Sequence, residues 1–252
     1  MSSSYYSLAR AFTASDFKLR YHDSAFGVVW SFLKPLILFS VLYTVFSVFM
    51  RFPIPHYGLY LLLGIIFWNF FVEATTHSIR SLLMKGPFIR KVHFPRTILV
   101  FSSTTIALMN LMVNLAVFAI FFALADVPLS WHMLYFPLWL AELYVLALGT
   151  GFALAALNAR YRDVEHLWDV VVPMGFWVTP IVYSLSMVPE PYRAYFVLNP
   201  MASLIEGARA SLLYGTAPDI QSVSLLTLLV ACVAMAGYFI FRLRAPYFAE
   251  EL

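Results

Sequence analysis

The sequence predicts an all-α, polytopic membrane protein with about six membrane-spanning helices. Of its 252 residues, 62% are hydrophobic and only 12% are charged, and the mean hydropathy is +0.81. A water-soluble domain of this composition would expose large apolar patches. The apolar runs recur from residue 29 to residue 242 and do not alternate with the period of two that barrel strands require. We therefore expect one continuous helical domain over residues 1–252, with lipid as its solvent.

Apolar runs between charged and turn residues give the expected spans, because a helix needs roughly 20 apolar residues to cross the hydrocarbon layer. The runs cover residues 29–50, 57–79, 97–125, 133–157, 168–188 and 222–242. Before them, residues 4–20 carry apolar side chains at near-helical spacing with charges between them. This pattern predicts a helix lying flat on the membrane surface, and an ordinary polar tail is the alternative.

Basic residues predict the orientation of the chain. Only Arg51, Arg193 and Arg209 fall in odd-numbered connections; the other Lys and Arg residues lie before or at the start of the first span, in even-numbered connections, or after the last span. Because cytoplasmic connections collect Lys and Arg, we expect both termini in the cytoplasm, in agreement with an even number of spans. The net charge of +3 follows from this topology and gives no reason to expect a nucleic-acid partner.

Two connections are expected to do more than join spans. Residues 88–95 alternate apolar and basic character between Pro87 and Pro95, which predicts a short helix lying across the membrane face; simple anchoring of the topology is the alternative. Residues 189–214 contain two proline-bounded apolar stretches, each too short to cross a bilayer. We expect external or re-entrant half-helices there, and a candidate outer gate, because such segments persist only where they pack on protein or line a cavity.

Enzyme motifs do not occur in the sequence. It contains no phosphate loop, no strand–serine–helix elbow, no CxxC pair and no HExxH, so we expect no catalytic residue, no metal site and no ATP hydrolysis in this chain. Glu73 and His77 share one helical face, but two residues do not make a metal site. Gly149, Thr150 and Gly151 form a small-residue cluster that is expected to ease helix packing.

Polar side chains near the middle of the spans are the next candidates. Asn110 and Asn114 are expected at mid-membrane in the third span, and Glu142 at similar depth in the fourth. A hydrogen-bonded contact between these helices is the favoured interpretation, and a proton relay is the alternative.

Aromatic residues make up 18% of the chain and cluster within the first, second and fifth spans. Such a surface offers a sugar ring apolar contact without tight binding, whereas packing against protein or lipid is the alternative for each residue. The candidates for a translocation path are Phe39, Tyr43, Phe46, Phe67, Trp68, Phe176, Trp177 and Tyr183.

A mixed-charge cluster at residues 160–166 precedes the fifth span. Asp163 and Glu165 favour a helix N-terminus, and the arginines at 160 and 162 can reach lipid phosphates. A solvated face is the alternative.

Several motifs resemble the polysaccharide-export permeases of type-2 ABC transporters, which include O-antigen, capsule and teichoic-acid exporters. Residues 16–21 (DFKLRY), followed by Ser24, Gly27, Trp30 and Pro35, are similar to the amino-terminal signature of that family. Further matches are 89–92 (IRKV) with 94–96 (FPR), 159–163 (ARYRD), 179–181 (TPI), and 199–201 (NPM) with Glu206 and Arg209. They occur in the expected order along almost the whole chain.

The resemblance implies a transporter permease rather than an enzyme. It implies a homodimer in the bacterial cytoplasmic (inner) membrane, in contact with membrane lipids, that carries an undecaprenyl-linked glycan outward, with O antigen as the first choice. Two copies of a separate ABC ATPase subunit would bind the ATP and Mg²⁺, and this chain would hold no cofactor.

Residue roles follow from the positions of the matching motifs. The resemblance implies a coupling helix that the ATPase receives, formed by Phe88, Ile89, Arg90, Lys91, Val92, His93, Phe94 and Pro95. Residues 4–20 would also touch the ATPase. A lipid pyrophosphate headgroup would gain access at Arg160, Arg162 and Asp163, and the external gate would include Asn199, Pro200, Glu206 and Arg209. The path would run between two copies of the chain, past the aromatic candidates.

Two other functions stay open at this point. One is an ABC permease for a drug or a small lipid. The other is a membrane glycan polymerase or glycosyltransferase, for which Asp163, Glu165 and Asp169 are the only candidate acidic catalytic residues. The identity of the glycan and of its lipid carrier is also open.

Overall fold

The computed structural model describes residues 12–13, 29–86 and 94–248, and the regular elements in these ranges are all helical. The elements are α2 (Val29–Tyr43) continued by the π-helix η1 (Thr44–Phe49), α3 (Tyr57–Met84), α5 (Thr97–Leu124), the 3-10 helix η2 (Trp131–Tyr135) leading into α6 (Phe136–Arg160), α7 (Asp163–Val178), η3 (Leu185–Met187), α8 (Glu190–Val197), α9 (Pro200–Leu212), α10 (Ile220–Arg244) and η4 (Ala245–Tyr247). The all-α prediction is confirmed for the described residues.

Within the described ranges, five helices are long and apolar enough to cross a membrane: Val29–Phe49, Tyr57–Met84, Thr97–Leu124, Trp131–Arg160 and Ile220–Tyr247. These correspond to the first four and the last of the expected spans, and the chain is a multi-pass membrane protein. The remaining expected span, 168–188, has the wrong bounds. Helix α7 begins at Asp163 and ends at Val178, so its 16 residues extend about 24 Å, less than the roughly 30 Å of a hydrocarbon layer.

Pro180 explains the early end of α7. A residue before proline avoids the helical region, and Thr179 has extended backbone angles of φ −81° and ψ 136°. The Tyr183 hydroxyl then donates to the carbonyls of Trp177 and Val178, both at 3.0 Å, which satisfies the last turn of the helix.

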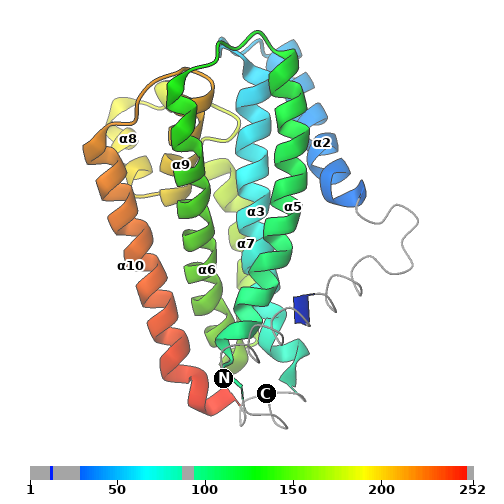
Figure 1. Cartoon of the computed structure of the whole chain (residues 1–252), viewed down its shortest axis with the longest axis vertical. Coiled ribbons are helices and arrows are strands. Elements are labelled where there is room, and N and C mark those ends of the chain that lie inside the picture. The colour runs from blue at the N-terminus through cyan, green and yellow to red at the C-terminus, as the bar shows by residue number, and fades with distance from the viewer. Residues whose placement is uncertain (1–11, 14–28, 87–93, 249–252) are drawn as a thin grey trace.

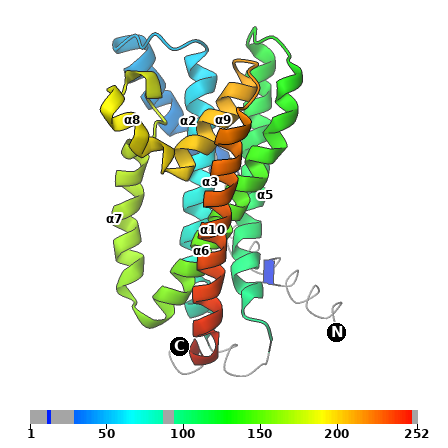
Figure 2. The ribbon, with the colours of Figure 1, turned by 90° about the vertical axis from the view of Figure 1, so that its left-hand side faces the viewer.

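The long helices run between two ends of the bundle, which we call the upper end and the lower end as they stand in Figure 1. Helix α3 packs against α2, α5 and α6, and α10 packs against the opposite side of α6. In Figure 2, α7 occupies the lower part of the bundle, and α8 and α9 lie above it at the upper end. These three short helices together extend along the height that a single long helix covers elsewhere.

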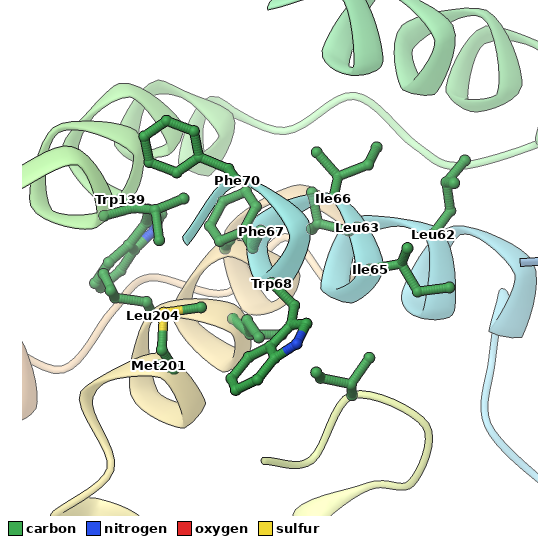
Figure 3. Close-up of a cluster of buried hydrophobic side chains, with 14 of the residues drawn as sticks. Leu62, Leu63, Ile65, Ile66, Phe67, Trp68, Phe70, Trp139, Met201 and Leu204 are labelled. Atoms are coloured by element: carbon green, nitrogen blue, oxygen red, sulfur yellow. The ribbon is translucent and has the colours of Figure 1, made fainter. Parts of the chain in front are cut away.

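The main hydrophobic core surrounds α3. Phe67 of this helix is fully buried, and it lies near Trp139 of α6 and near Met201 and Leu204 of α9 (Figure 3). By contrast, α2 and α10 bury few of their side chains within the chain, and α7 buries none fully. The single chain therefore has its core at α3 and leaves the outer helices largely exposed.

A second hydrophobic cluster closes the lower end. The ring of Phe12 lies 5.9 Å from that of Phe94, and the ring of Phe241 lies 5.2 Å from that of Phe248. Residues near the beginning and near the end of the chain therefore meet at the same end of the bundle.

Small residues bring α6 and α10 into close contact, as the sequence predicted for the cluster at 149–151. A Cβ atom added to Gly149 would collide with the backbone of Ala234, and one added to Gly237 would collide with the carbonyl of Gly149. At Gly151 the added atom would lie 2.6 Å from the Ser78 hydroxyl of α3. Backbone contact of this kind supplies the dispersion energy that holds helices together in lipid.

We predict that Gly237→Ala destabilises the fold. Alanine normally favours a helix over glycine, but here its methyl group forces α10 away from α6, at a cost of about 1–3 kcal/mol. The measurement is the thermal unfolding of the detergent-purified protein. Met235→Ala is the matched control, because Met235 is 62% exposed on the same helix; equal unfolding temperatures for the two variants would contradict the close contact.

Candidate functional site

Side chains of neighbouring elements satisfy the irregular backbone that follows α7. The carbonyls of Pro180 and Ile181 accept hydrogen bonds from the Arg209 guanidinium at 2.7 and 2.8 Å. The next two carbonyls, at residues 182 and 183, accept from the hydroxyls of Tyr57 and Tyr60, both at 2.9 Å. Four consecutive carbonyls therefore have side-chain donors, as a non-helical segment within a membrane protein requires.

Arg209 is the centre of this arrangement and is fully buried. Besides the two carbonyls after α7, it donates to the Tyr60 carbonyl at 3.1 and 3.0 Å and to the Glu206 carboxylate at 2.7 Å. Its guanidinium carbon lies 3.3 Å from the centroid of the Tyr60 ring. Gly64 leaves room for it, since a Cβ atom there would lie 2.6 Å from the Arg209 Nη2. A buried arginine with this many acceptors fixes α9 against α3.

Asn199 connects the beginning of α9 to the end of α7. Its side-chain oxygen accepts from the amides of Met201 and Ala202, at 3.1 and 3.4 Å, and caps the helix that Pro200 opens. Its amide donates to the Thr179 hydroxyl at 3.0 Å. The structure thus brings the candidate gate residues 199, 200, 206 and 209 onto one helix that is bonded to the segment after α7. Their role in a gate stays a prediction.

Tyr214 borders this region in the connection between α9 and α10. Burial raises the pKa of Tyr214, and the charge of Glu206 adds a smaller rise against the lowering effect of Arg209. The Tyr214 phenol therefore stays protonated and available as a hydrogen-bond donor.

The aromatic candidates divide among three places. Phe67 and Trp68 lie in the core of the single chain, at 0% and 8% exposure. Phe39 and Tyr43 lie on α2 and Phe46 lies on η1, and the Phe39 and Tyr43 rings are 5.6 Å apart. Phe176 and Trp177 are in contact at 5.4 Å near the end of α7, and Trp177 is 55% exposed. Tyr183 caps α7. Whether a path passes them stays a prediction.

The mixed-charge cluster at residues 160–166 lies at the lower end. Arg160, Arg162 and Asp163 are all exposed, and the Arg160 guanidinium lies 5.2 Å from the Tyr161 ring. Glu165 pairs with Arg80 of α3 at 2.7 Å, which ties the first turn of α7 to the last turns of α3. Among the described residues, no group of three or more His, Cys, Asp or Glu side chains could hold a metal ion.

The predicted coupling segment is only partly within the described residues. Phe94 and Pro95 are described and lie outside any helix. Phe88, Ile89, Arg90, Lys91, Val92 and His93 lie outside the described ranges, as does most of the predicted surface helix 4–20. The described end of the coupling segment, Phe94, packs at the lower end next to Phe12.

The predicted contact between Glu142 and the asparagines of α5 is wrong. The Asn110 amide donates to Glu73 of α3 at 2.6 Å, and the Asn114 amide donates to the carbonyls of Asn110 and Ser31. Glu142 instead accepts from the Thr227 hydroxyl of α10. The rotation of each helix about its axis decides which neighbour a side chain meets, and the positions of apolar residues along the sequence do not give that rotation.

An open cavity of about 740 Å³, lined by both polar and apolar side chains, lies between α2, α3 and α5. Its lining residues are Trp30, Ser31, Lys34, Pro35, Leu38, Ile66, Asn69, Phe70, Val72, Glu73, Thr76, His77, Arg80, Asn110, Leu111 and Asn114. Sequence analysis considered Glu73 and His77 only as a metal site and overlooked Asn69 and Thr76. The available signal was the polar stripe along α3 at residues 69, 73, 76, 77 and 80, which is one helical face.

Comparison with known proteins defines the class of this chain. Residues 7–213 match the ABC-2 type transporter family, and the chain belongs to it. It is therefore the membrane subunit of a transporter, and the ATPase activity belongs to a separate ABC subunit with which it pairs.

Individual relatives extend along nearly the whole chain. It is 29% identical over 242 residues to an O-antigen export system permease protein RfbA of Klebsiella pneumoniae, a match that covers 95% of this chain and 93% of the relative. A protein of the same description from Myxococcus xanthus is 28% identical over 240 residues, covering 94% and 92% of the two chains.

We predict that Arg209→Leu prevents stable folding. The substitution removes every donor to the carbonyls of residues 180 and 181 and leaves Glu206 without its cation, a loss of about 3–5 kcal/mol for a buried group. Thermal unfolding and the yield of monodisperse protein measure it.

Arg193→Ala is the control, since Arg193 also donates to two carbonyls, of Val188 and Ser186, at a water-facing edge, and should cost about 1 kcal/mol. Arg209→Lys keeps the charge but loses the forked set of N–H donors, so its loss of stability should lie between those of Arg209→Leu and Arg193→Ala. An Arg209→Leu protein as stable as Arg193→Ala would refute the assignment.

Proposed function

We propose that this permease exports a lipid-linked polysaccharide, with O antigen as the first choice, from the cytoplasmic side of the membrane. The observation that carries the proposal is the match to permeases described as O-antigen exporters along about the full length of the chain, 95% and 94% in two relatives. Aromatic side chains exposed on α2 and α7 add support, because sugar rings stack on such surfaces.

The chain crosses the inner membrane six times, with both termini in the cytoplasm. Helix α7 enters from the lower end, and α8 and α9, which lie above it in Figure 2, complete the fifth passage as re-entrant half-helices. The lower end carries Lys85, Arg96, Arg160, Arg162, Arg242 and Arg244, and the upper end carries the exposed Arg51 and the half-buried Arg193. An excess of basic residues supports a cytoplasmic lower end. Residues 189–214 then form the external gate.

Two copies of the chain form the export path between them. Of the window that spans the membrane in α2, only 11% is buried within the chain, and α7 has no fully buried residue. Trp30, Tyr43 and Trp177 are exposed on these helices at 41%, 37% and 55%. A homodimer that faces these helices inward gives the glycan many weak contacts and no single tight site.

Two ABC ATPase subunits bind ATP and Mg²⁺ and drive the cycle from the lower end. When the two ATPase subunits close, they push on residues 88–95, and residues 4–20 form a second contact with the ATPase. Phe94 packs with Phe12 in the cluster that also holds Leu82 of α3, Leu99 of α5 and Phe241 of α10. A displacement of Phe94 therefore reaches three long helices and opens the surface between the two copies. A lipid headgroup gains access beside Arg160, Arg162 and Asp163.

The test of the proposed function is ATP hydrolysis by the copurified permease and ATPase in lipid, with and without an undecaprenyl-linked glycan. Glycan-dependent hydrolysis supports glycan export. A response to small hydrophobic compounds alone would favour the drug or lipid permease, and failure of the two proteins to copurify would favour the membrane enzyme.

We predict that the double substitution Arg90→Glu, Phe94→Ala abolishes transport while the protein still inserts into the membrane. The charge reversal and the loss of an aromatic contact act on the segment that receives the push from the ATPase. Export in cells and membrane content of the permease are measured together. Arg51→Glu, a charge reversal at the upper end, is the control and should export normally. Normal export by the double variant would contradict the coupling role of residues 88–95.

A further inference from the structure

The cavity between α2, α3 and α5 contains polar side chains that the packing of the helices does not use. The Asn69 amide, the Thr76 hydroxyl and the Lys34 ammonium all line it, and none of them has a hydrogen-bond or ion-pair partner within the described part of the chain. Lys34 is exposed, whereas Asn69 and Thr76 are half-buried along α3, where unpaired polar groups of a membrane protein are costly unless something binds them.

Other threonines of the bundle do have hydrogen-bond partners for their hydroxyls. The hydroxyls of Thr75, Thr104 and Thr105 all donate back to carbonyls of their own helix, at 2.7 to 3.1 Å. Thr76 sits next to Thr75 on α3, makes no such bond and is directed at the cavity. Its hydroxyl is therefore available to a ligand.

The lining has the chemistry of a site for a phosphorylated sugar. Lys34 and Arg80 supply cationic donors that suit a phosphate. Asn69, Thr76 and the Glu73 carboxylate, which Asn110 holds at 2.6 Å, supply the amide, hydroxyl and carboxylate groups that pair with sugar hydroxyls. The rings of Trp30 and Phe70 supply apolar faces.

Size and position agree with this chemistry. The volume of about 740 Å³ lies within the range of roughly 300–1,000 Å³ typical of small-molecule sites, so the cavity holds one end of a glycan and not the polymer. Arg80 lines the cavity and at the same time pairs with Glu165 in the first turn of α7. Through this ion pair the cavity adjoins the mixed-charge cluster at residues 160–166.

We propose that this cavity binds the sugar phosphate that joins the transported glycan to its lipid carrier. Lys34 and Arg80 hold the phosphate, while Asn69, Thr76 and Glu73 bind the hydroxyls of the first sugar. The inference rests on the proposed function for the source of the ligand, whereas the chemistry of the cavity stands on the lining residues alone.

The first experiment measures binding to the full-length permease in complex with its ATPase, in phosphatidylcholine nanodiscs. The probe is a fluorescent short-chain polyprenyl diphosphate carrying N-acetylglucosamine. Asn69→Leu and Lys34→Met are each expected to weaken binding about tenfold, the effect of one lost hydrogen bond. Lys34→Arg, which keeps the positive charge, should retain most of the affinity for the probe. Thr105→Val, which removes a hydroxyl that bonds back to Phe101, is the control and should bind normally.

Thermal unfolding separates binding from packing. Because Asn69 has no partner within the described residues, Asn69→Leu should unfold at the same or a higher temperature while it binds the probe less well. A purely structural role for Asn69 would lower the unfolding temperature. Unchanged binding by both Asn69→Leu and Lys34→Met would overturn the site.

Competition identifies the source of the ligand. Displacement of the probe by free N-acetylglucosamine 1-phosphate, but not by phosphatidylglycerol, supports a sugar-phosphate site. Displacement by phosphatidylglycerol alone would overturn it in favour of a bulk lipid headgroup. If glycan stimulates ATP hydrolysis but the cavity variants bind the probe normally, this inference fails and glycan export stands. If free sugar phosphate binds and the cavity variants lose it, but no lipid-linked glycan stimulates hydrolysis, the site stands and glycan export fails.

Discussion

The backbone after α7 imposes the strictest requirement on this fold. A chain that leaves the helical conformation inside a bilayer exposes carbonyls that lipid cannot satisfy. Arg209 and the tyrosines at 57 and 60 donate to the four carbonyls from residue 180 to residue 183. Because those donors are present, α7 can stop at Val178 and the chain can turn into α8 and α9 instead of crossing as one straight helix. The first turn of α3 and the last turn of α9 therefore supply these donors together.

Different parts of helix α3 make three different sets of contacts. Its upper turns hold the segment after α7, its middle turns form the core with Trp139, Met201 and Leu204, and its lower turns carry the polar stripe that faces the cavity. The last of these turns is also bound to α7 through Arg80 and Glu165. A movement imposed at the lower end therefore reaches both the cavity and, through a rigid helix, the segment that α9 holds. In the proposed function, this continuity lets an ATPase that docks at the lower end influence the upper end.

Much of this architecture was readable in the sequence, and the failures have definite causes. The lengths of apolar runs located five helices long enough to span a membrane, and the prolines at 189, 191 and 200 located the two short helices α8 and α9, because both signals are local. The end of the fifth helix was misplaced by ten residues, since hydrophobicity continues past Pro180 although the helix does not. The partner of Glu142 was missed because hydropathy carries no information about helix rotation. The importance of Arg209 was visible as a motif position, but its burial depends on donors and space from α3, which no local pattern encodes.

The contact between Gly64 and Arg209 limits how this protein can diverge. Any side chain at position 64 occupies the space of the guanidinium, and any smaller side chain at position 209 leaves an empty space beside position 64 as well as unpaired carbonyls. A substitution at either position alone therefore lowers the stability of the fold. We expect Gly64 and Arg209 to be retained together although they lie on different helices. In the proposed sugar-phosphate site, Asn69 and Thr76 have no partner within the described residues, so we expect variation that adapts the protein to a new cargo at such positions. Stability and specificity can then evolve on separate parts of the same helix.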